Sequence, residues 1–85
     1  MTDIIHDPQQ QAFLCVVDGH EARLRYRLLD QHQVDAYSTF VPGELRGQGL
    51  ADQLARAFFD WCKGQNLEII PSCSYIETWL RRHGG

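Results

Sequence analysis

The first half of the chain alternates between hydrophobic and polar residues, which predicts β-strands with one buried and one solvated face. Residues 12–17 are apolar throughout, and Asp18 and Gly19 after them favour a tight hairpin turn. The next predicted strand, over 21–28, alternates without a break. Its apolar face carries Ala22, Leu24, Tyr26 and Leu28, and its polar face carries Arg23, Arg25 and Arg27.

A third strand and a helix follow. The polar residues 30–33 predict a turn, and residues 34–41 predict a strand that Pro42 ends, because proline has no N–H for a sheet ladder. The hydrophobic spacing then changes to the helical period, which indicates an amphipathic helix from Leu50 to a stop near Gly64. The buried side of this helix carries Leu50, Leu54, Phe58 and Trp61.

The last part of the chain predicts one more strand and one more helix. Residues 67–71 suit a short strand, which we expect to be central and parallel to the third strand. Ser74 and Glu77 match a capping box that starts a final helix. Its buried stripe would be Ile76, Trp79 and Leu80. The order β-β-β-α-β-α predicts an α+β fold with a mixed sheet and a helix crossing over between the last two strands. Residues 1–8 and 83–85 are expected to be frayed.

The chain has 85 residues, which suits a single domain with one small core. With 44% hydrophobic and 22% charged residues, its composition is that of a globular protein rather than a disordered one. Its longest apolar run, residues 12–17, is far below the ~18–20 residues of a membrane helix. The first residues lack the basic and hydrophobic regions of a signal peptide. We therefore expect one cytoplasmic domain over residues 1–85 with no membrane partner.

The net charge and the spacing of cysteines and histidines bear on two further classes of function, nucleic-acid binding and metal binding. The formal net charge of −3 offers no electrostatic basis for binding the phosphates of DNA or RNA. Cys15, Cys62 and Cys73 have neither the number nor the spacing of a disulfide framework or a zinc knuckle, which suits a reducing compartment. The four histidines are scattered, with no pair at helical or strand spacing. We therefore expect no nucleic-acid partner and no metal.

The glycine-rich turn over residues 41–51, between the third strand and the first helix, carries the most chemistry. Gly47 and Gly49 allow the backbone to approach a ligand closely or to adopt positive φ. A helix N-terminus presents unpaired N–H groups, and Arg46 adds a cation, so the turn favours an anion such as phosphate. The Walker pattern and a complete G-x-G-x-x-G are absent. A purely structural tight turn is the alternative interpretation.

The turn resembles the pyrophosphate loop of the Gcn5-related N-acetyltransferases. That loop has glutamine or arginine first, glycine three positions later, and glycine or alanine two positions after that, as in residues 46–51. From about residue 13 to 83 the chain resembles the very small YjdJ-like branch of this superfamily. The resemblance covers the hairpin at Asp18, the strand end at 39–41 and the segment 70–75. It implies a minimal acetyltransferase fold without the N-terminal helices of larger members.

This resemblance implies a minimal acetyl-CoA-dependent N-acetyltransferase. Acetyl-CoA would be the co-substrate, and the acceptor would be an amine on a small molecule or a protein. Amides of the loop would hold the pyrophosphate, and the preceding strand end would pair with the pantetheine arm. The residues implied to bind coenzyme A are Thr39, Phe40, Val41, Arg46, Gly47, Gln48, Gly49, Leu50 and Ala51.

Three residues are candidates for catalysis. Cys73 directly precedes the last helix, whose dipole favours a thiolate, and it occupies the family's usual cysteine position. It would act as a nucleophile or a polar wall beside the thioester, or else fill space as a small buried residue. Tyr75, in the first helical turn, would protonate the leaving thiolate or simply pack. Ser38 stands where relatives commonly carry a histidine, and a hydroxyl is a poor general base at neutral pH.

Two further alternatives remain open. Ser38 and the missing N-terminal helices favour a second interpretation, a non-catalytic acyl-CoA-binding or protein-interaction module on the same fold. Arg23, Arg25 and Arg27 form a basic ridge, which is either a solvated face paired with acids such as Asp35 or a docking surface. The docked group would be an acidic partner or the 3′-phosphate of the coenzyme. The acceptor and the oligomeric state have no signature in the sequence.

Overall fold

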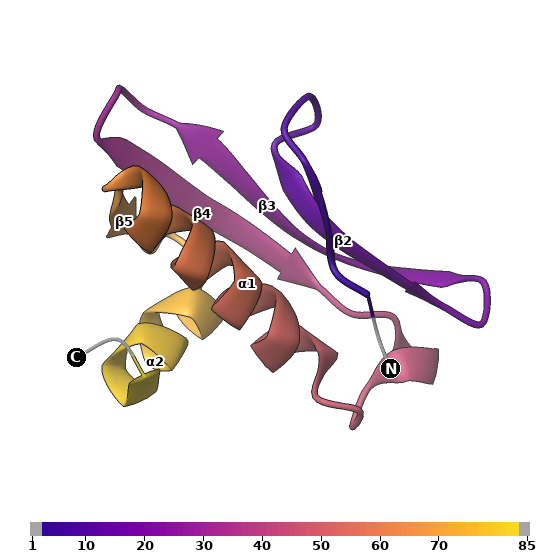
Figure 1. The fold of residues 1–85 in the computed structure, drawn as a ribbon. Helices are drawn as coiled ribbons and strands as arrows, with labels where there is room; N and C mark the ends of the chain where they lie inside the picture. Colours follow the sequence, from indigo (N-terminus) through magenta and orange to yellow (C-terminus); the bar gives the residue numbers. More distant parts are fainter. Residues whose placement is uncertain (1–2, 84–85) are drawn as a thin grey trace.

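The computed structural model describes residues 3–83, which form a five-stranded sheet with two α-helices (Figure 1). The strands are β1 (Ile5–Asp7), β2 (Ala12–Val17), β3 (His20–Leu28), β4 (Gln33–Phe40) and β5 (Glu68–Ile70). The helices are η1, a 3₁₀ turn (Gly43–Leu45), α1 (Leu50–Gln65) and α2 (Ser74–His83). Each strand lies beside the strand that precedes it in sequence, so the sheet order is β1-β2-β3-β4-β5.

The sheet is mixed. Strands β1 to β4 run antiparallel to their neighbours, and β5 runs parallel to β4 after the crossover through α1. This topology confirms the predicted α+β fold with a helix between the last two strands. The prediction that the last strand is central is wrong, because β5 pairs only with β4 and forms an edge of the sheet.

The N-terminal segment contains a strand that the sequence pattern does not predict. Residues 1–8 are expected to be frayed, yet residues 5–7 pair with β2 as β1. The physical reason is His6, whose ring stacks on Phe13 with centroids 4.2 Å apart. Its Nε2 also shares a 2.6 Å hydrogen bond with the hydroxyl of Tyr26. At the other end His83 belongs to α2, while the expected fraying of residues 1, 2, 84 and 85 lies outside the described residues.

The helix boundaries differ in part from those predicted. Helix α1 starts at Leu50 as predicted, but it continues to Gln65 and is capped by Asn66 in the left-handed region (φ 57°) rather than stopping at Gly64. Asparagine tolerates this conformation because its short polar side chain can bond locally.

The predicted capping box at the start of α2 does not form. The first helical bond runs from the amide of Glu77 to the carbonyl of Cys73, at 3.0 Å. The carboxylate of Glu77 accepts a hydrogen bond from Arg81 at 2.8 Å instead of reaching back to the helix start. Cys73 is therefore the N-cap of α2, the position for which the sequence predicts Ser74.

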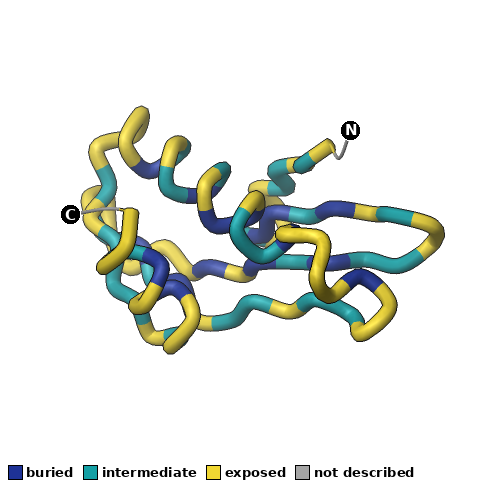
Figure 2. The backbone as a smooth tube through the Cα atoms, turned by 90° about the horizontal axis from the view of Figure 1, so that it is seen from below, coloured by how far each residue is buried: buried dark blue, intermediate teal, exposed yellow. Residues whose placement is uncertain are grey.

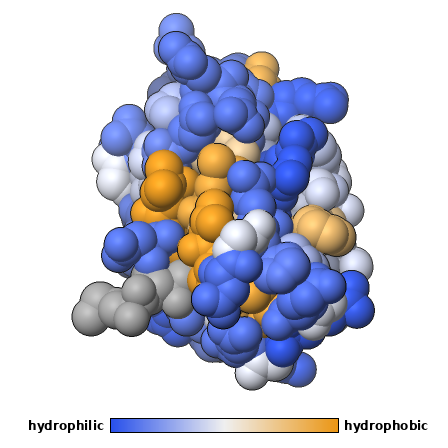
Figure 3. Space-filling view, turned by 90° about the vertical axis from the view of Figure 1, so that its right-hand side faces the viewer, coloured by the Kyte–Doolittle hydropathy of each residue, from blue (hydrophilic) through white to orange (hydrophobic). Residues whose placement is uncertain are grey.

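The core lies where α1 and α2 meet the middle strands, and the turns around it are exposed (Figure 2). The alternation in β3 correctly predicts Ala22, Leu24 and Tyr26 as buried. Leu28 is 46% exposed, because β2 pairs only as far as Arg25 and leaves the last residues of β3 without a neighbour on that side. At the end of the molecule that lies to the right in Figure 1, hydrophobic side chains reach the surface in a strip among polar ones (Figure 3).

Candidate functional site

The second half of β4 forms an open edge of the sheet. Strand β5 pairs with β4 only up to Ile70, which lies opposite Asp35, and the amide of Cys73 then donates to the carbonyl of Ala36 at 3.0 Å. Tyr37 is an extra residue in the pairing with β3, a β-bulge that bends the strand. Residues 37–40 therefore have no β5 neighbour, and their backbone edge is open to a ligand.

The register places two predicted site residues on opposite faces of this edge. Residues directly opposite each other in an antiparallel pair share a face of the sheet. Ser38 lies opposite Arg25, on the side turned away from the core, whereas Thr39 lies opposite the fully buried Leu24. The thiol Sγ of Cys73 lies 3.8 Å from the hydroxyl Oγ1 of Thr39. The structure thus brings Cys73 and Thr39 together and places Ser38 apart from them.

The turn before α1 leaves a row of backbone donors without partners. Gly47 and Gly49 have φ values of +87° and +75°, a left-handed conformation that glycine adopts without strain. Gly49 is the N-cap of α1, and no side chain caps the helix. Within residues 3–83, no hydrogen bond uses an amide N–H from Gly47 to Asp52. Unpaired amides at the positive end of a helix dipole favour an anion.

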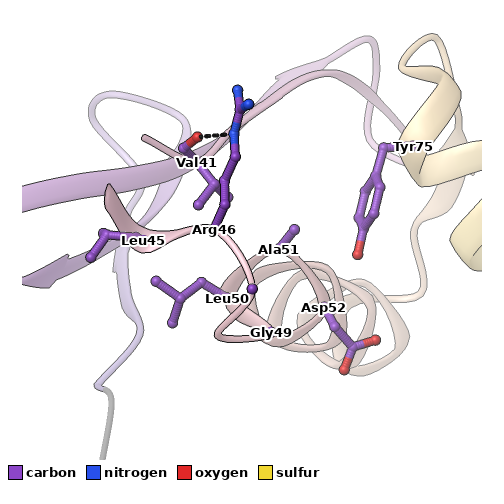
Figure 4. A pocket seen from close by; sticks show the side chains of 9 residues that line it. Val41, Leu45, Arg46, Gly49, Leu50, Ala51, Asp52 and Tyr75 are labelled. Carbon is purple, nitrogen blue, oxygen red and sulfur yellow. Dashed lines mark hydrogen bonds between the residues drawn. The ribbon is translucent and has the colours of Figure 1, made fainter. Parts of the chain in front are cut away.

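Arg46 lies at the start of this row. Its Nε donates a hydrogen bond to the carbonyl of Val41 at 3.3 Å, so the side chain leans back over the end of β4 (Figure 4). Its guanidinium stays exposed, with its other N–H groups free to meet an anion. The arginine therefore ties the loop to the strand and adds positive charge between them.

A pocket of about 210 Å³ lies between this loop and α2 (Figure 4). Its lining includes seven of the predicted site residues, namely Val41, Arg46, Gly47, Gly49, Leu50, Ala51 and Tyr75. Ser38, Thr39, Phe40, Gln48 and Cys73 lie outside the lining. Leu45 and Asp52 belong to the lining but are not among the predicted site residues. Tyr75 forms the wall opposite the loop, with its hydroxyl directed toward α1 (Figure 4).

Asp52 connects the two walls of the pocket. Its carboxylate Oδ1 accepts a 2.7 Å hydrogen bond from the indole Nε1 of Trp79, which fixes α2 against the first turn of α1. Arg56 and His83 approach the same carboxylate at 3.9 and 3.7 Å. The sequence signal for this residue is its place in the first turn of a helix, where an acidic side chain is favoured by the dipole. That signal does not reveal its partner on α2.

The environment of Tyr75 keeps its phenol protonated. Burial raises the pKa of Tyr75 above its usual value of 10.0, and the nearby negative charge of Asp52 raises it further. The positive charge of Arg82 opposes this shift. At neutral pH, the hydroxyl of Tyr75 is therefore a hydrogen-bond donor at the edge of the pocket.

Two other findings bear on the predicted partners. In the described part of the chain, no group of three or more His, Cys, Asp or Glu side chains is arranged to hold a metal ion. None of the helices within residues 3–83 has the length and apolar character needed to cross a membrane.

Comparisons with known proteins place this geometry in context. Residues 12–84 match the profile of the GCN5-related N-acetyltransferases. The chain is 31% identical to protein NATD1 of Mus musculus over 80 residues, covering 92% of this chain and 73% of that protein. It is 30% identical to protein NATD1 of Homo sapiens, with 92% and 71% covered. A GCN5-like protein from Staphylococcus aureus, solved by NMR, has a similar structure with a TM-score of 0.73, 29% identity, and 94% and 78% of the two chains covered.

Proposed function

Because the chain belongs to the GCN5-related N-acetyltransferase family, we propose that it binds acetyl-CoA and transfers the acetyl group to an amine. The observation that carries this proposal is the row of free amides from Gly47 to Asp52 at the start of α1. Backbone donors at a helix N-terminus favour phosphate groups. The pyrophosphate of the coenzyme would bind there, with Arg46 beside it.

The rest of the coenzyme would extend from the loop toward the open edge of β4. Its pantetheine arm carries amide groups, which can pair with the backbone of residues 39–41 as a neighbouring strand would. The thioester would then lie near Thr39 and Cys73, whose side chains touch. Backbone N–H groups on the open edge would stabilise the oxyanion that forms on the acetyl carbonyl.

The reaction in this arrangement is a direct transfer. The amine nitrogen attacks the thioester carbonyl carbon, a C–N bond forms, and the C–S bond breaks. The amine loses a proton to solvent, and the departing thiolate takes a proton from the phenol of Tyr75, which solvent then restores. The phenol of Tyr75 is protonated at neutral pH and so has a proton to donate, and burial, which raises its pKa, makes it a weaker acid than a free phenol.

Titration of ¹⁵N-labelled protein with acetyl-CoA, and separately with coenzyme A, tests the binding step. We expect amide shifts centred on residues 46–51 and 39–41. Mass spectrometry of an amine panel incubated with acetyl-CoA then tests transfer. If millimolar ligand moves no amide in these segments, the turn is only structural and the proposal fails.

The role of Cys73 is tested by paired variants. If its thiol attacks the thioester and forms an acyl-enzyme, Cys73→Ala and Cys73→Ser both abolish transfer, and acetylated Cys73 accumulates when no amine is present. If the thiol is only a polar wall beside Thr39, Cys73→Ser retains activity. Coenzyme affinity stays nearly unchanged in either case. Lower affinity with turnover intact would contradict any chemical role.

One observation favours a second candidate function, coenzyme binding without transfer. Ser38, at the position where relatives commonly have a histidine, lies on the face opposite Cys73 and Thr39. Within residues 3–83, no histidine is hydrogen-bonded to Cys73 or Thr39. His6 is bonded to Tyr26, and His20 begins β3. His32 lies in an exposed turn, and His83 lies beside Asp52 and Trp79. Binding of acetyl-CoA with no acetylated product from any amine would support this candidate. A gain of transfer in Ser38→His would show that only the base is missing.

A further inference from the structure

The face of the sheet turned away from α1 carries a row of arginines. On β3, the buried residues Ala22, Leu24 and Tyr26 face the core, so the residues between them point to the other side. The register sets Arg23 opposite Phe40, Arg25 opposite Ser38 and Arg27 opposite Asp35. We call the surface made by Arg23, Arg25, Arg27, Tyr37 and Phe40 the arginine face.

Positive charge on the arginine face is only partly neutralised. Arg23 pairs with Glu21 at 3.0 Å, but within residues 3–83 no carboxylate lies within 4.0 Å of Arg25 or Arg27. Asp35, the acid expected to pair with the arginines, lies opposite Arg27 without forming an ion pair, and its buried Oδ1 has no hydrogen-bond partner in the described chain. The Nε of Arg23 is likewise buried without an acceptor. In a chain of net charge −3, three arginines beside two carboxylates, those of Glu21 and Asp35, leave this face locally positive.

The same face exposes large aromatic side chains. The guanidinium of Arg27 lies 5.2 Å from the centre of the Tyr37 ring, which orients both groups at the surface. Phe40 is 50% exposed opposite Arg23. Arginine and aromatic residues together are enriched in protein-binding surfaces, where the rings supply contact area and the guanidinium supplies paired donors.

The arginine face adjoins the open edge of β4 from the side opposite Cys73. Tyr37, Ser38 and Phe40 belong to that edge, and Ser38 shares the face of Arg25. A ligand on the arginine face is therefore next to the open edge, because Tyr37 and Phe40 belong to both.

We propose that the acceptor amine is carried by an acidic peptide segment that docks on the arginine face. This inference rests on the proposed acetyl transfer. Carboxylates of the segment pair with Arg25 and Arg27, its apolar groups contact Tyr37 and Phe40, and its amine enters the open edge of β4. The specificity is for an amine flanked by carboxylates, because a basic segment would meet unpaired positive charge.

The test uses three blocked heptapeptides with one central lysine, flanked on both sides by glutamates, by glutamines or by arginines. Each is titrated into ¹⁵N-labelled protein saturated with coenzyme A, which permits binding without turnover. We expect the glutamate peptide to move the amides of residues 23–27 and 37–40 and to bind more tightly than the other two. Its affinity falls as salt rises from 50 to 500 mM, because exposed charges are screened.

Two variants that remove positive charge supply the test and its control. Arg25→Gln with Arg27→Gln weakens binding of the glutamate peptide by about five- to tenfold, the range expected for two exposed ion pairs. Lys63→Gln removes one positive charge on α1, outside the arginine face. It is expected to change the affinity for the glutamate peptide by less than about twofold. Equal affinities of the glutamate and arginine peptides, or unchanged affinity in the double variant, would overturn the proposal.

Two further titrations test whether a ligand other than an acidic peptide binds the arginine face. If coenzyme A moves the amides of Arg25 and Arg27 and 3′-dephospho-coenzyme A does not, the face holds the 3′-phosphate and the acidic-peptide proposal is wrong. If a single-stranded oligonucleotide binds there as tightly as the glutamate peptide, it is also wrong. The failure of the proposed function has a different signature, since it is the absence of acetyl-CoA binding at residues 46–51 in the unmodified protein.

Discussion

Two ends of the same small core differ in how completely their polar groups are satisfied. At one end, an aromatic cluster made by His6, Phe13, Tyr26, Phe58 and Trp61 packs ring against ring, with neighbouring centroids 4.2–6.3 Å apart. Its buried hydroxyl, on Tyr26, is bonded to His6. At the other end, the turn before α1 and the second half of β4 leave backbone groups without partners. The aromatic cluster thus pairs its polar groups within the protein, whereas the open end leaves backbone donors unpaired.

The largest effect is expected from Phe58→Ala in the aromatic cluster. Phe58 is 1% exposed and contacts the rings of Phe13, Tyr26 and Trp61, so truncation leaves a cavity that costs about 3–5 kcal/mol. Urea unfolding followed by tryptophan fluorescence measures the loss. Phe59→Ala is the control, because Phe59 is half-buried against Trp79 and should lose less. Equal decreases in the free energy of unfolding would show that the two ends of the core contribute equally to stability.

At the open end, Gly49→Ala is expected to weaken both folding and coenzyme binding. A Cβ at Gly49 meets no atom within 4 Å, so the strain arises only from its φ of +75° and is worth about 1–2 kcal/mol. If the helix start shifts to relieve it, the free amides move, and affinity for coenzyme A falls about three- to tenfold by calorimetry. Unchanged affinity in a variant whose amide resonances at residues 47–52 have shifted would mean that these amides do not hold the pyrophosphate.

Gly64→Ala is the matched control for that substitution. Gly64 lies within α1, has no positive φ and has open space at its Cβ. Alanine there is expected to stabilise the protein by about 0.5–1 kcal/mol through helix propensity. Coenzyme affinity should stay at the unsubstituted value. A drop would indicate that any change in α1 disturbs the loop.

The smallest effect expected is a pH dependence of stability that comes from His6. Burial lowers the pKa of His6 below its usual 6.5, although the charge of Asp7 opposes this. The unfolded chain therefore binds a proton more readily, and the free energy of unfolding decreases as pH falls below about 6.5. His6→Gln should flatten this decrease in denaturation series between pH 7.5 and 5, whereas His32→Gln, in an exposed turn, should keep it. An identical slope in His6→Gln would contradict the assignment.

Parts of the fold with a strong local pattern could be predicted from the sequence. Strict alternation in β3 and helical spacing in α1 mark their buried faces, because each side chain's direction follows directly from its position. Strand β1 has no such pattern, and its pairing depends on His6 meeting Tyr26, twenty residues away. The edge position of β5 depends in the same way on contacts that no local pattern records.

The candidate site likewise has one part that the sequence predicts and another part that it does not. The glycine loop is a continuous segment, so its spacing alone predicts an anion-binding turn. The contact of Cys73 with Thr39, the bond from Trp79 to Asp52 and the separation of Ser38 from Cys73 all join distant segments. Each depends on the register of β4 and on where α2 packs, which are tertiary properties.

The bulge at Tyr37 has a consequence for how the bend in the open edge could be gained or lost. Strand β4 contains one residue more than its partner can match, and the register of Ser38 and Thr39 is counted from that point. Exchanging side chains leaves this count unchanged, whereas deleting Tyr37 would make the two strands equal and straighten β4. The bend in the open edge is thus encoded by the length of a strand. Removing the codon for Tyr37 would take the bend away and leave every other residue, with its pairing to β3, in place.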